Sequence, residues 1–527
     1  MARGGTAADA AVAMAAVLGV VEPHSTGLGG DVFALYYDAA GQQVTAVLGN
    51  GASPAQLTRE LVLNEVNAGQ WADHSPLAVT VPGAPAAWVD IMVRWGSQTL
   101  TLPDLLEPAI RMAEDGVPIS KVASNGWVPA SKIASMDPEF SSTFLILDDE
   151  TGERRAPREG ELFTNRGLAR SMRLLASRGS SGFYDGPLAE AIVEAIQTRG
   201  GVMELDDLRA HTTEFADAVS LRYQGVDIHE VPSPSQGVAA LQALALWDRL
   251  RPEKLDAESR LQAHVLHKLI ESMRLAFADV SAFVTDPRRK PFCDRKSEQL
   301  LCSSYLSSRA ALVKDSEAMA VATCGEFSLA TSDTVQFCVV DKYGNAISML
   351  NSNFKAFGSG IVPVGYGFPL HSRGLNFSLA PGHPNAIVPG TRPYHTLMPG
   401  MATRDGGFFA AFGVMGGFMQ PQGHLQVLVN LIDCGMDPQM ALDFPRFCVG
   451  TGYGPPDAGN SVLINLEDGI GHEEASALAQ MGHQVRHPVR SWDRSLFGRG
   501  QIVILKDNIL WAGSDGRGDG MAGVVHM

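Results

Sequence analysis

Strand-like and helical runs alternate along the whole chain, and this mixture constrains the fold more than any other feature of the sequence. The apolar spacing predicts helices over 7–21, 422–432, 438–444 and 473–481 and mostly helical structure from Pro103 to Arg199. Runs rich in β-formers predict two hairpins, over 32–48 and 334–350, and later strands over 408–412 and 500–505. Because such elements must cover one another's apolar faces, we expect an α+β protein built in layers.

Composition narrows the class of protein further. Of the 527 residues, 45% are hydrophobic and 19% are charged, which excludes a disordered chain and provides a large core. The length alone permits one large domain or about three ordinary ones. A net charge of -16 would repel phosphate backbones, so no nucleic-acid partner is predicted. No apolar run reaches the roughly 18 to 20 residues of a spanning helix, so we expect a soluble protein without a membrane partner.

Cysteine and histidine spacing gives no support for a metal site. The six cysteines include no C-x-x-C pair, which favours free thiols, although their even number leaves disulfides open. The motifs H-E-x-x-H and G-x-S-x-G are absent, and His371, His383 and His395 are interpreted as hydrogen-bonded histidines of the surface or core. The sequence therefore predicts no metal and no other cofactor.

Two further features of the first residues concern location and phosphate binding. No secretory signal pattern is visible, which favours a cytoplasmic protein, although a signal lost with an earlier segment would leave the same sequence. The stretch "STGLGGD", 25–31, has neither phosphate-loop spacing nor a following helix. We interpret it as a tight structural turn.

Thr334 opens the first strand of the second hairpin, directly after a polar connector that runs from Lys314 to Asp333. An internal threonine is a weak nucleophile, but one that becomes the first residue of a chain carries its own base, the free α-amine. Such a residue also needs oxyanion donors, which a glycine turn predicted at 413–417 could supply. A threonine at this position is equally compatible with a simple strand former, so these residues alone leave both interpretations open.

At these residues the chain resembles the γ-glutamyltransferase (glutathione hydrolase) family of N-terminal-nucleophile hydrolases. The likeness runs in order, and nearly end to end, through "GGTAADAAVAMAAVLGVVEPHSTGLGGD", "GFYDGPLAEAIVEAIQTRGG", "VPSPSQG", "SDTVQFCVVDKYGNAIS", "FSLAPGHPN" and "GSDGRGDG". It implies a four-layer αββα sandwich, made as a single large domain in one precursor that cleaves itself between Asp333 and Thr334. The large fragment 1–333 and the small fragment 334–527 would remain partners.

The same resemblance implies roles for individual residues. Thr334 would be the nucleophile that accepts the acyl group of a small amide substrate, and water or an amine would release it. Ser352 would hydrogen-bond the nucleophile, and Gly416 and Gly417 match the oxyanion-hole glycines of the family. The family implies no cofactor for this hydrolase or acyltransferase chemistry.

The substrate side departs from typical members of the family. Asn50 stands where they carry an arginine for the glutamate carboxylate, and Leu375 and Asn376 replace the paired aspartates that hold the ammonium. His395 and Thr396 replace two serines. A bidentate arginine and a charged pair are therefore missing, which weakens the case for a γ-glutamyl substrate.

The chain looks instead like a divergent branch of the family, of which oxamate amidohydrolase is an example. In that interpretation Arg373 would hold a substrate carboxylate, with His395, Thr396 and Gln420 as neutral partners; alternatively, Arg373 pairs a structural carboxylate. A third possibility is an inactive relic that stays uncut, because the usual Thr-His after the nucleophile is replaced by Val335 and Gln336.

Overall fold

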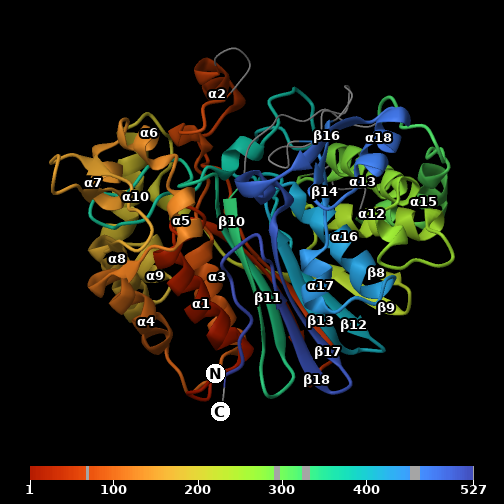
Figure 1. Ribbon diagram of the computed structural model, residues 1–527. Helices are drawn as coiled ribbons and strands as arrows, with labels where there is room; N and C mark the ends of the chain where they lie inside the picture. The colour runs from red at the N-terminus through yellow and green to blue at the C-terminus, as the bar shows by residue number, and fades with distance from the viewer. Residues whose placement is uncertain (67–70, 290–296, 323–332, 451–462, 526–527) are drawn as a thin grey trace.

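Two large sheets form the centre of the computed structural model, which describes residues 1–66, 71–289, 297–322, 333–450 and 463–525 (Figure 1). Within these residues, one sheet has five strands in the order β10 (Asp333–Val340), β11 (Ala346–Phe354), β1 (Asp31–Asp38), β2 (Gln43–Gly49) and β7 (Glu214–Asp217). The other has six, in the order β18 (Ile509–Ser514), β17 (Arg499–Lys506), β13 (Gly407–Met415), β12 (Gly400–Arg404), β9 (Val226–Glu230) and β8 (Val219–Tyr223).

Both predicted hairpins are confirmed, and β1 joins them. β1 pairs antiparallel with β2 on one side and with β11 on the other, so segments far apart in the sequence lie in one sheet. In the second hairpin, the Asp341 carboxylate accepts hydrogen bonds from the backbone amides of Tyr343, at 2.9 Å, and Asn345, at 3.0 Å. This Asx-type turn fixes how β11 returns along β10.

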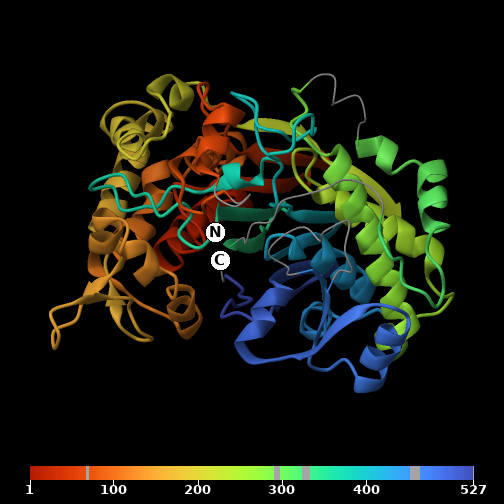
Figure 2. The same cartoon turned by 90° about the horizontal axis from the view of Figure 1, so that it is seen from above.

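The side chains of β1 show how the layers are stacked. Val32, Ala34 and Tyr36 belong to a buried cluster with the helix α1 (Ala7–Val21), whereas Phe33 and Leu35 belong to a cluster that includes residues of β12 and β13. Alternate residues of a strand point to opposite faces, so one face of the first sheet covers helices and the other covers the second sheet. Figure 2 shows helices on both outer sides of the stacked sheets.

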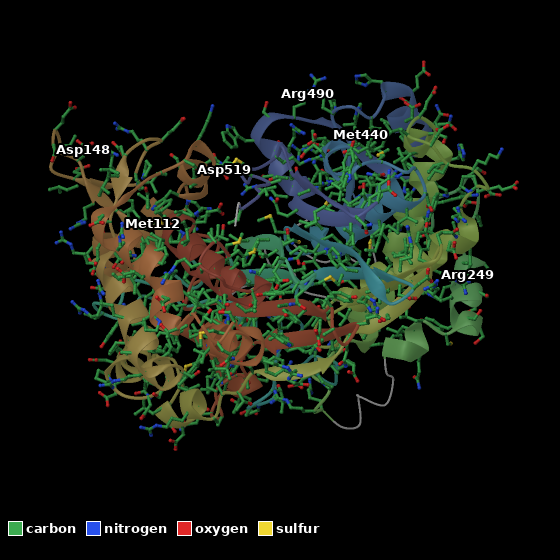
Figure 3. The ribbon with its side chains drawn as sticks, turned by 90° about the horizontal axis from the view of Figure 1, so that it is seen from below. Met112, Asp148, Arg249, Met440, Arg490 and Asp519 are labelled. Carbon is green, nitrogen blue, oxygen red and sulfur yellow. The ribbon has the colours of Figure 1, made fainter. Side chains whose placement is uncertain are left out.

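Two groups of helices cover the outer faces. Alanine-rich α1 packs closely on the first sheet together with α3 (Ala84–Trp95), α4 (Leu102–Asp115), α8 (Arg166–Arg178) and α10 (Pro187–Gln197). The second group comprises α12 (Gly237–Leu250), α13 (Ala263–Phe283), α16 (Met419–Ile432), α17 (Pro438–Asp443) and α18 (His472–Gln480). In Figure 3, Met112 of α4 and Arg249 of α12 lie on opposite sides of the molecule.

Shorter elements connect these layers. The helices among them are α2 (Arg59–Glu65), α5 (Lys121–Gly126), α6 (Ala130–Ala134), α7 (Pro138–Phe144), α9 (Ser181–Tyr184), α11 (Leu205–Arg209), α14 (Ser297–Leu300) and α15 (Ser303–Ala310). The strands are β3 (Val117–Pro118), β4 (Ile146–Leu147), β5 (Arg154–Arg155), β6 (Leu162–Phe163), β14 (Phe447–Val449), β15 (Leu463–Glu467) and β16 (Gln484–Val489). Across the described ranges, no helix combines the length and the apolar character that a bilayer crossing requires.

Most sequence-based expectations about the fold are confirmed, and one needs correction. The mixture of helices and strands in layers is as expected, and the four cysteines of the described ranges, Cys302, Cys338, Cys434 and Cys448, are free thiols. The predicted glycine turn at 413–417 is wrong in its bounds, because β13 continues to Met415 and the chain turns only at Gly416. Residues 323–332 of the predicted connector, Cys293 and Cys324 lie outside the described residues.

Candidate active site

Thr334 is buried near the start of β10, with 1% of its surface exposed. Its Oγ1 donates a hydrogen bond to Ser352 Oγ at 3.0 Å. The pairing of β10 with β11 is irregular here, because Asp333 lies opposite Phe354 but Val335 lies opposite Asn351. One strand therefore carries an extra residue, and such bulges re-aim side chains next to active sites. This irregularity lies at the residues where the two hydroxyls meet.

Ser352 connects the threonine to Arg373. Its Oγ also accepts hydrogen bonds from the backbone amide of Phe354, at 2.9 Å, and from Arg373 Nη2, at 3.4 Å. Arg373 begins a short 3-10 helix, Arg373–Asn376, and its Nη1 donates to Thr396 Oγ1 at 2.9 Å. The guanidinium carbon lies 4.4 Å from the ring centroid of Phe354, and the arginine is fully buried. Both Nη atoms therefore point to the hydroxyls around the threonine.

Asp31 supplies the negative charge of this group. It lies opposite Ser352 in the pairing of β1 with β11, and its Oδ2 is 3.4 Å from Arg373 Nε and 3.4 Å from His371 Nδ1. Burial alone would raise the pKa of Asp31, but His371, the hydrogen bond with His395 and the charge of Arg373 outweigh it and hold that pKa well below its ordinary range. Burial lowers the pKa of Arg373 to about 10, so the guanidinium keeps its charge at neutral pH.

The geometry fixes the proton of His395. The backbone amide of Leu397 donates to its Nδ1 at 3.1 Å, so the proton lies on Nε2 and is donated to Asp31 Oδ2 at 3.0 Å. Burial, together with the charge of Arg373, lowers the pKa of His395 to about 3. His395 is thus a neutral donor that orients Asp31. The expectation of a hydrogen-bonded core histidine is met, and the partner is a site carboxylate.

The glycine turn is connected to the same group of side chains. Gly416 and Gly417 follow β13 with φ values of 129° and 60°, a backbone conformation that favours glycine. The Gln236 amide nitrogen donates to the carbonyl oxygens of Thr396, at 2.7 Å, and Gly417, at 2.9 Å. A continuous series of contacts therefore runs from Thr334 to the turn.

The other residues at positions that match the family's substrate contacts, Gln420, Asn376 and Asn50, are placed less closely. Gln420, at the start of α16, accepts from the backbone amide of Met398 at 3.2 Å, and its amide nitrogen has no hydrogen bond to a described residue. Asn376 donates to the Tyr394 carbonyl oxygen at 2.9 Å. Asn50 is buried, but neither atom of its amide contacts a described polar partner. The structure therefore brings Ser352, Arg373, His395 and Thr396 to the threonine, and leaves Asn50 outside this network.

Three residues of the site were not found from the sequence: Asp31, His371 in its present role, and Gln236. Asp31 ends the "STGLGGD" stretch, which was interpreted only as a turn. Glycine is required at two positions of this turn. A Cβ on Gly29 would lie 2.1 Å from the Pro369 carbonyl oxygen, and a Cβ on Gly30 would lie 2.5 Å from the Ser352 carbonyl oxygen. The signal for Asp31 was its position at the end of a glycine turn that leads directly into a buried strand.

One group of side chains in the described ranges has the spacing of metal ligands. The ligand atoms of His267, Glu271 and His483 all lie within 4.8 Å of one another. They are already engaged: the two imidazoles are hydrogen-bonded at 2.8 Å, and Glu271 accepts from Arg274 at 2.6 Å and from the Met319 amide at 2.9 Å. Their polar contacts are satisfied within the protein, so we assign no ion to them.

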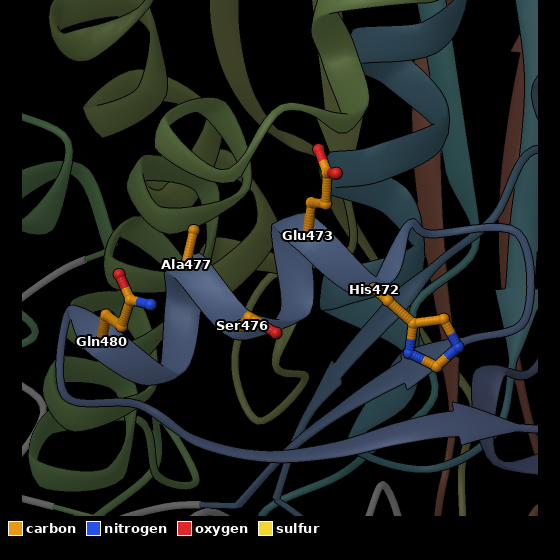
Figure 4. Close-up of a pocket in the computed structure, with 5 residues that line it drawn as sticks. All are labelled: His472, Glu473, Ser476, Ala477 and Gln480. Atoms are coloured by element: carbon orange, nitrogen blue, oxygen red, sulfur yellow. The ribbon is translucent and has the colours of Figure 1, made fainter.

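A hollow of about 380 Å³ lies along α18, and its lining includes none of the residues described above around Thr334 (Figure 4). Its lining comes from one helix, namely His472, Glu473, Ser476, Ala477 and Gln480. Side chains from a single helix surface do not converge on a reacting atom, so we place no chemistry there.

Comparison with known proteins identifies the family. The family described as Gamma-glutamyltranspeptidase matches residues 1–525. The chain belongs to this family. The Glutathione hydrolase-like YwrD proenzyme of Bacillus subtilis (strain 168) is 33% identical over 520 residues, which cover 99% of this chain and 94% of the relative. The Oxamate amidohydrolase proenzyme of Klebsiella pneumoniae subsp. pneumoniae is also 33% identical, over 525 residues, with 99% and 94% covered.

A solved structure with a similar sequence supports the fold. The crystal structure of cephalosporin acylase from Bacillus halodurans superposes with a TM-score of 0.86 and 34% sequence identity, covering 99% of this chain and 92% of the other. The predicted resemblance to the gamma-glutamyltranspeptidase family is therefore confirmed. With hydrolase and acylase proenzymes as its relatives over nearly the whole chain, the protein is an enzyme.

Proposed function

We propose that the protein is a self-cleaving amide hydrolase in which Thr334 becomes the N-terminal nucleophile. The observation that carries the proposal is the hydrogen bond between the Thr334 and Ser352 hydroxyls inside a buried polar group. Cleavage between Asp333 and Thr334 divides the chain into fragments of 333 and 527 − 333 = 194 residues. The proenzyme names of the relatives support such processing.

The two fragments would stay together after cleavage, because each sheet contains strands of both. The five-stranded sheet takes β1, β2 and β7 from the large fragment, and the six-stranded sheet takes β8 and β9 from it. The strands β11, β12, β13, β17 and β18 belong to 334–527, and so does β10 from Thr334 onward. This order of helices, sheet, sheet and helices supports the αββα fold of N-terminal-nucleophile hydrolases, with one domain built from both fragments.

The chemistry follows from the freed terminus. The Thr334 α-amine takes the hydroxyl proton as the oxygen attacks the substrate carbonyl carbon, and the same proton then leaves with the departing amine. The resulting threonyl ester is hydrolysed by water, which returns the enzyme to its starting state. The backbone amides of Gly416 and Gly417 would stabilise the oxyanion, and each such donor typically lowers the barrier by about 3 kcal/mol.

Arg373 favours a substrate whose carboxylate lies close to the scissile bond. Its Nη2 is 3.4 Å from Ser352 Oγ, which is 3.0 Å from Thr334 Oγ1, so the guanidinium lies no more than 6.4 Å, the sum of the two, from the nucleophile. In an oxamate-like amide the carboxylate is bonded directly to the scissile carbonyl carbon. In a γ-glutamyl amide three further carbons separate them, at about 1.5 Å per bond. A small oxamate-like amide, whose carboxylate is bonded to the scissile carbonyl carbon, therefore fits this arginine better.

The contact between Arg373 and Asp31 supports the alternative role as well, since it pairs the arginine with a structural carboxylate through Nε. The two roles are compatible, because Asp31 approaches Nε while Nη1 and Nη2 face Thr396 and Ser352. A bidentate edge would remain available to a substrate that displaces these hydroxyls.

The test is a comparison of cleavage and hydrolysis in matched variants. Purified protein should give two bands on a denaturing gel, and mass spectrometry should find a fragment that begins at Thr334. Thr334→Ala should stay intact and inactive, whereas Thr331→Ala, which removes a nearby hydroxyl of the same connector, should cleave normally. An intact wild-type chain after long incubation would favour the inactive relic.

The substrate is tested with a panel on the cleaved enzyme. Release of ammonia from oxamate, with little activity on γ-glutamyl-p-nitroanilide, is the expected result. The opposite preference would overturn the assignment of Arg373 but would leave the threonine mechanism intact.

A further inference from the structure

Glu230 and His424 form a fully buried polar pair that the proposed mechanism does not use. Glu230 ends β9, and His424 lies on α16. His424 Nδ1 is 2.7 Å from Glu230 Oε1, and the backbone amide of Val414 donates to His424 Nε2 at 3.2 Å. Through His424, the pair is therefore hydrogen-bonded to the backbone of β13 at Val414, two residues before Gly416.

The contacts fix the proton of this histidine. A backbone amide can only donate, so His424 Nε2 must carry a lone pair and the proton must lie on Nδ1, where Glu230 Oε1 accepts it. Burial lowers the pKa of His424 to about 3, which agrees with a neutral imidazole. Glu230 therefore selects the tautomer that His424 needs to accept from Val414.

The position of Val414 explains why the contact matters. β12 pairs with β13 only as far as Phe412, whereas β17 continues beside β13 to Met415. His424 thus satisfies the backbone where the neighbouring strand has ended. α16 also lies directly against this segment, because a Cβ on Gly423 would lie 2.6 Å from the Val414 side chain. The end of β13 is held by β17 on one side and by His424 on the other.

We propose that Glu230 and His424 are positioning residues that fix the end of β13 and thereby aim the Gly416 and Gly417 amides at the developing oxyanion. The inference rests on the proposed function, which assigns the oxyanion to these two amides. Donors that act in the transition state raise kcat more than they affect KM. A displacement of about 1 Å at such a site can cost about 10²-fold in rate.

Two substitutions of His424 test whether its side chain must be long enough to accept from Val414, because both replacements are polar amides of different length. His424→Gln can place its amide oxygen near the position of Nε2 and still accept from Val414, whereas His424→Asn is too short to do so. We expect His424→Asn to lower kcat by about 10- to 100-fold at nearly constant KM, and His424→Gln to stay within about threefold of wild type. Equal kcat values for the two variants would overturn the proposal.

Glu230 gives a second, independent comparison. Glu230→Gln keeps an acceptor for Nδ1 and should preserve kcat. Glu230→Met removes the acceptor, frees the imidazole to move its proton to Nε2, and should lower kcat as strongly as His424→Asn. A Glu230→Met enzyme with normal kcat would contradict the tautomer argument.

The control is Gln426→Met on the same helix. Gln426 is also buried and accepts from a strand amide, that of Phe447 at 2.9 Å, but this strand is β14. It should lower the melting temperature without changing kcat per cleaved active site. If Thr334→Ala protein still hydrolysed substrate, the proposed function would fall; if only His424→Asn behaved as wild type, the positioning role alone would fall.

Discussion

Ser352→Ala tests most directly whether the hydrogen bond between Ser352 and Thr334 positions the proposed nucleophile. It removes the hydroxyl that accepts a hydrogen bond from Thr334 Oγ1 at 3.0 Å. In the wild-type protein the buried backbone amide of Phe354 donates to the same oxygen at 2.9 Å, and the substitution leaves this amide without that acceptor. An unsatisfied buried donor costs about 1 to 3 kcal/mol of stability. A rotated Thr334 hydroxyl should slow both self-cleavage and hydrolysis by about 10- to 100-fold, the equivalent of about 1.4 to 3 kcal/mol in barrier.

Ser348→Ala provides a matched control on the same strand and the same face. Ser348 is also fully buried, and its Oγ donates to the Phe412 carbonyl oxygen at 2.8 Å, away from Thr334. Both variants should lose stability in urea unfolding, but only Ser352→Ala should lose rate in a time course of band conversion and in ammonia release. Equal rates in the two variants would refute the assignment of Ser352 to the nucleophile.

Two further predictions use other parts of the structure. Gly30→Ala should slow self-cleavage by at least about tenfold, because its Cβ would lie 2.5 Å from the Ser352 carbonyl oxygen, whereas Gly523→Ala, whose Cβ meets nothing within 4 Å, should cleave as wild type. Burial, with His267 beside it, lowers the pKa of His483 from 6.5 to about 3. Between these two pH values the imidazole is protonated in the unfolded chain but stays neutral in the folded chain. The free energy of unfolding should therefore fall toward acid pH, by up to about 1.4 kcal/mol per pH unit, and His483→Gln should have a shallower slope in urea titrations from pH 7 to 4.5; parallel slopes would contradict this.

The sequence predicted those elements whose apolar period is strong. α1 was expected over 7–21 and spans Ala7–Val21, and both hairpins have the expected partners. The strand β18 was not predicted, because its residues do not alternate between buried and exposed positions. Ile509, Leu510 and Trp511 are all 45 to 60% exposed at the sheet edge. β12 follows a Gly/Pro-rich stretch and is made of five short or flexible residues, "GMATR", that carry no strand signal.

The site was predictable where it depends on one hairpin. Thr334 and Ser352 lie on strands joined by a five-residue turn, so their meeting follows from a local register. Asp31 and His395 are 364 positions apart, and no period in the sequence links them. Only the packing of the layers brings the carboxylate under the arginine, which is why sequence reasoning found Arg373 but not its partner.

The polar group around Thr334 is shared between the two proposed fragments. Asp31 and Gln236 precede the proposed cleavage site, whereas Ser352, Arg373 and Thr396 follow it. Without Asp31, the fully buried charge of Arg373 would lose its carboxylate partner, and an unpaired buried charge typically costs several kcal/mol. The surroundings that we propose to activate the threonine therefore exist only after both parts have folded together, so self-cleavage and hydrolysis should both require the complete fold rather than the small fragment alone.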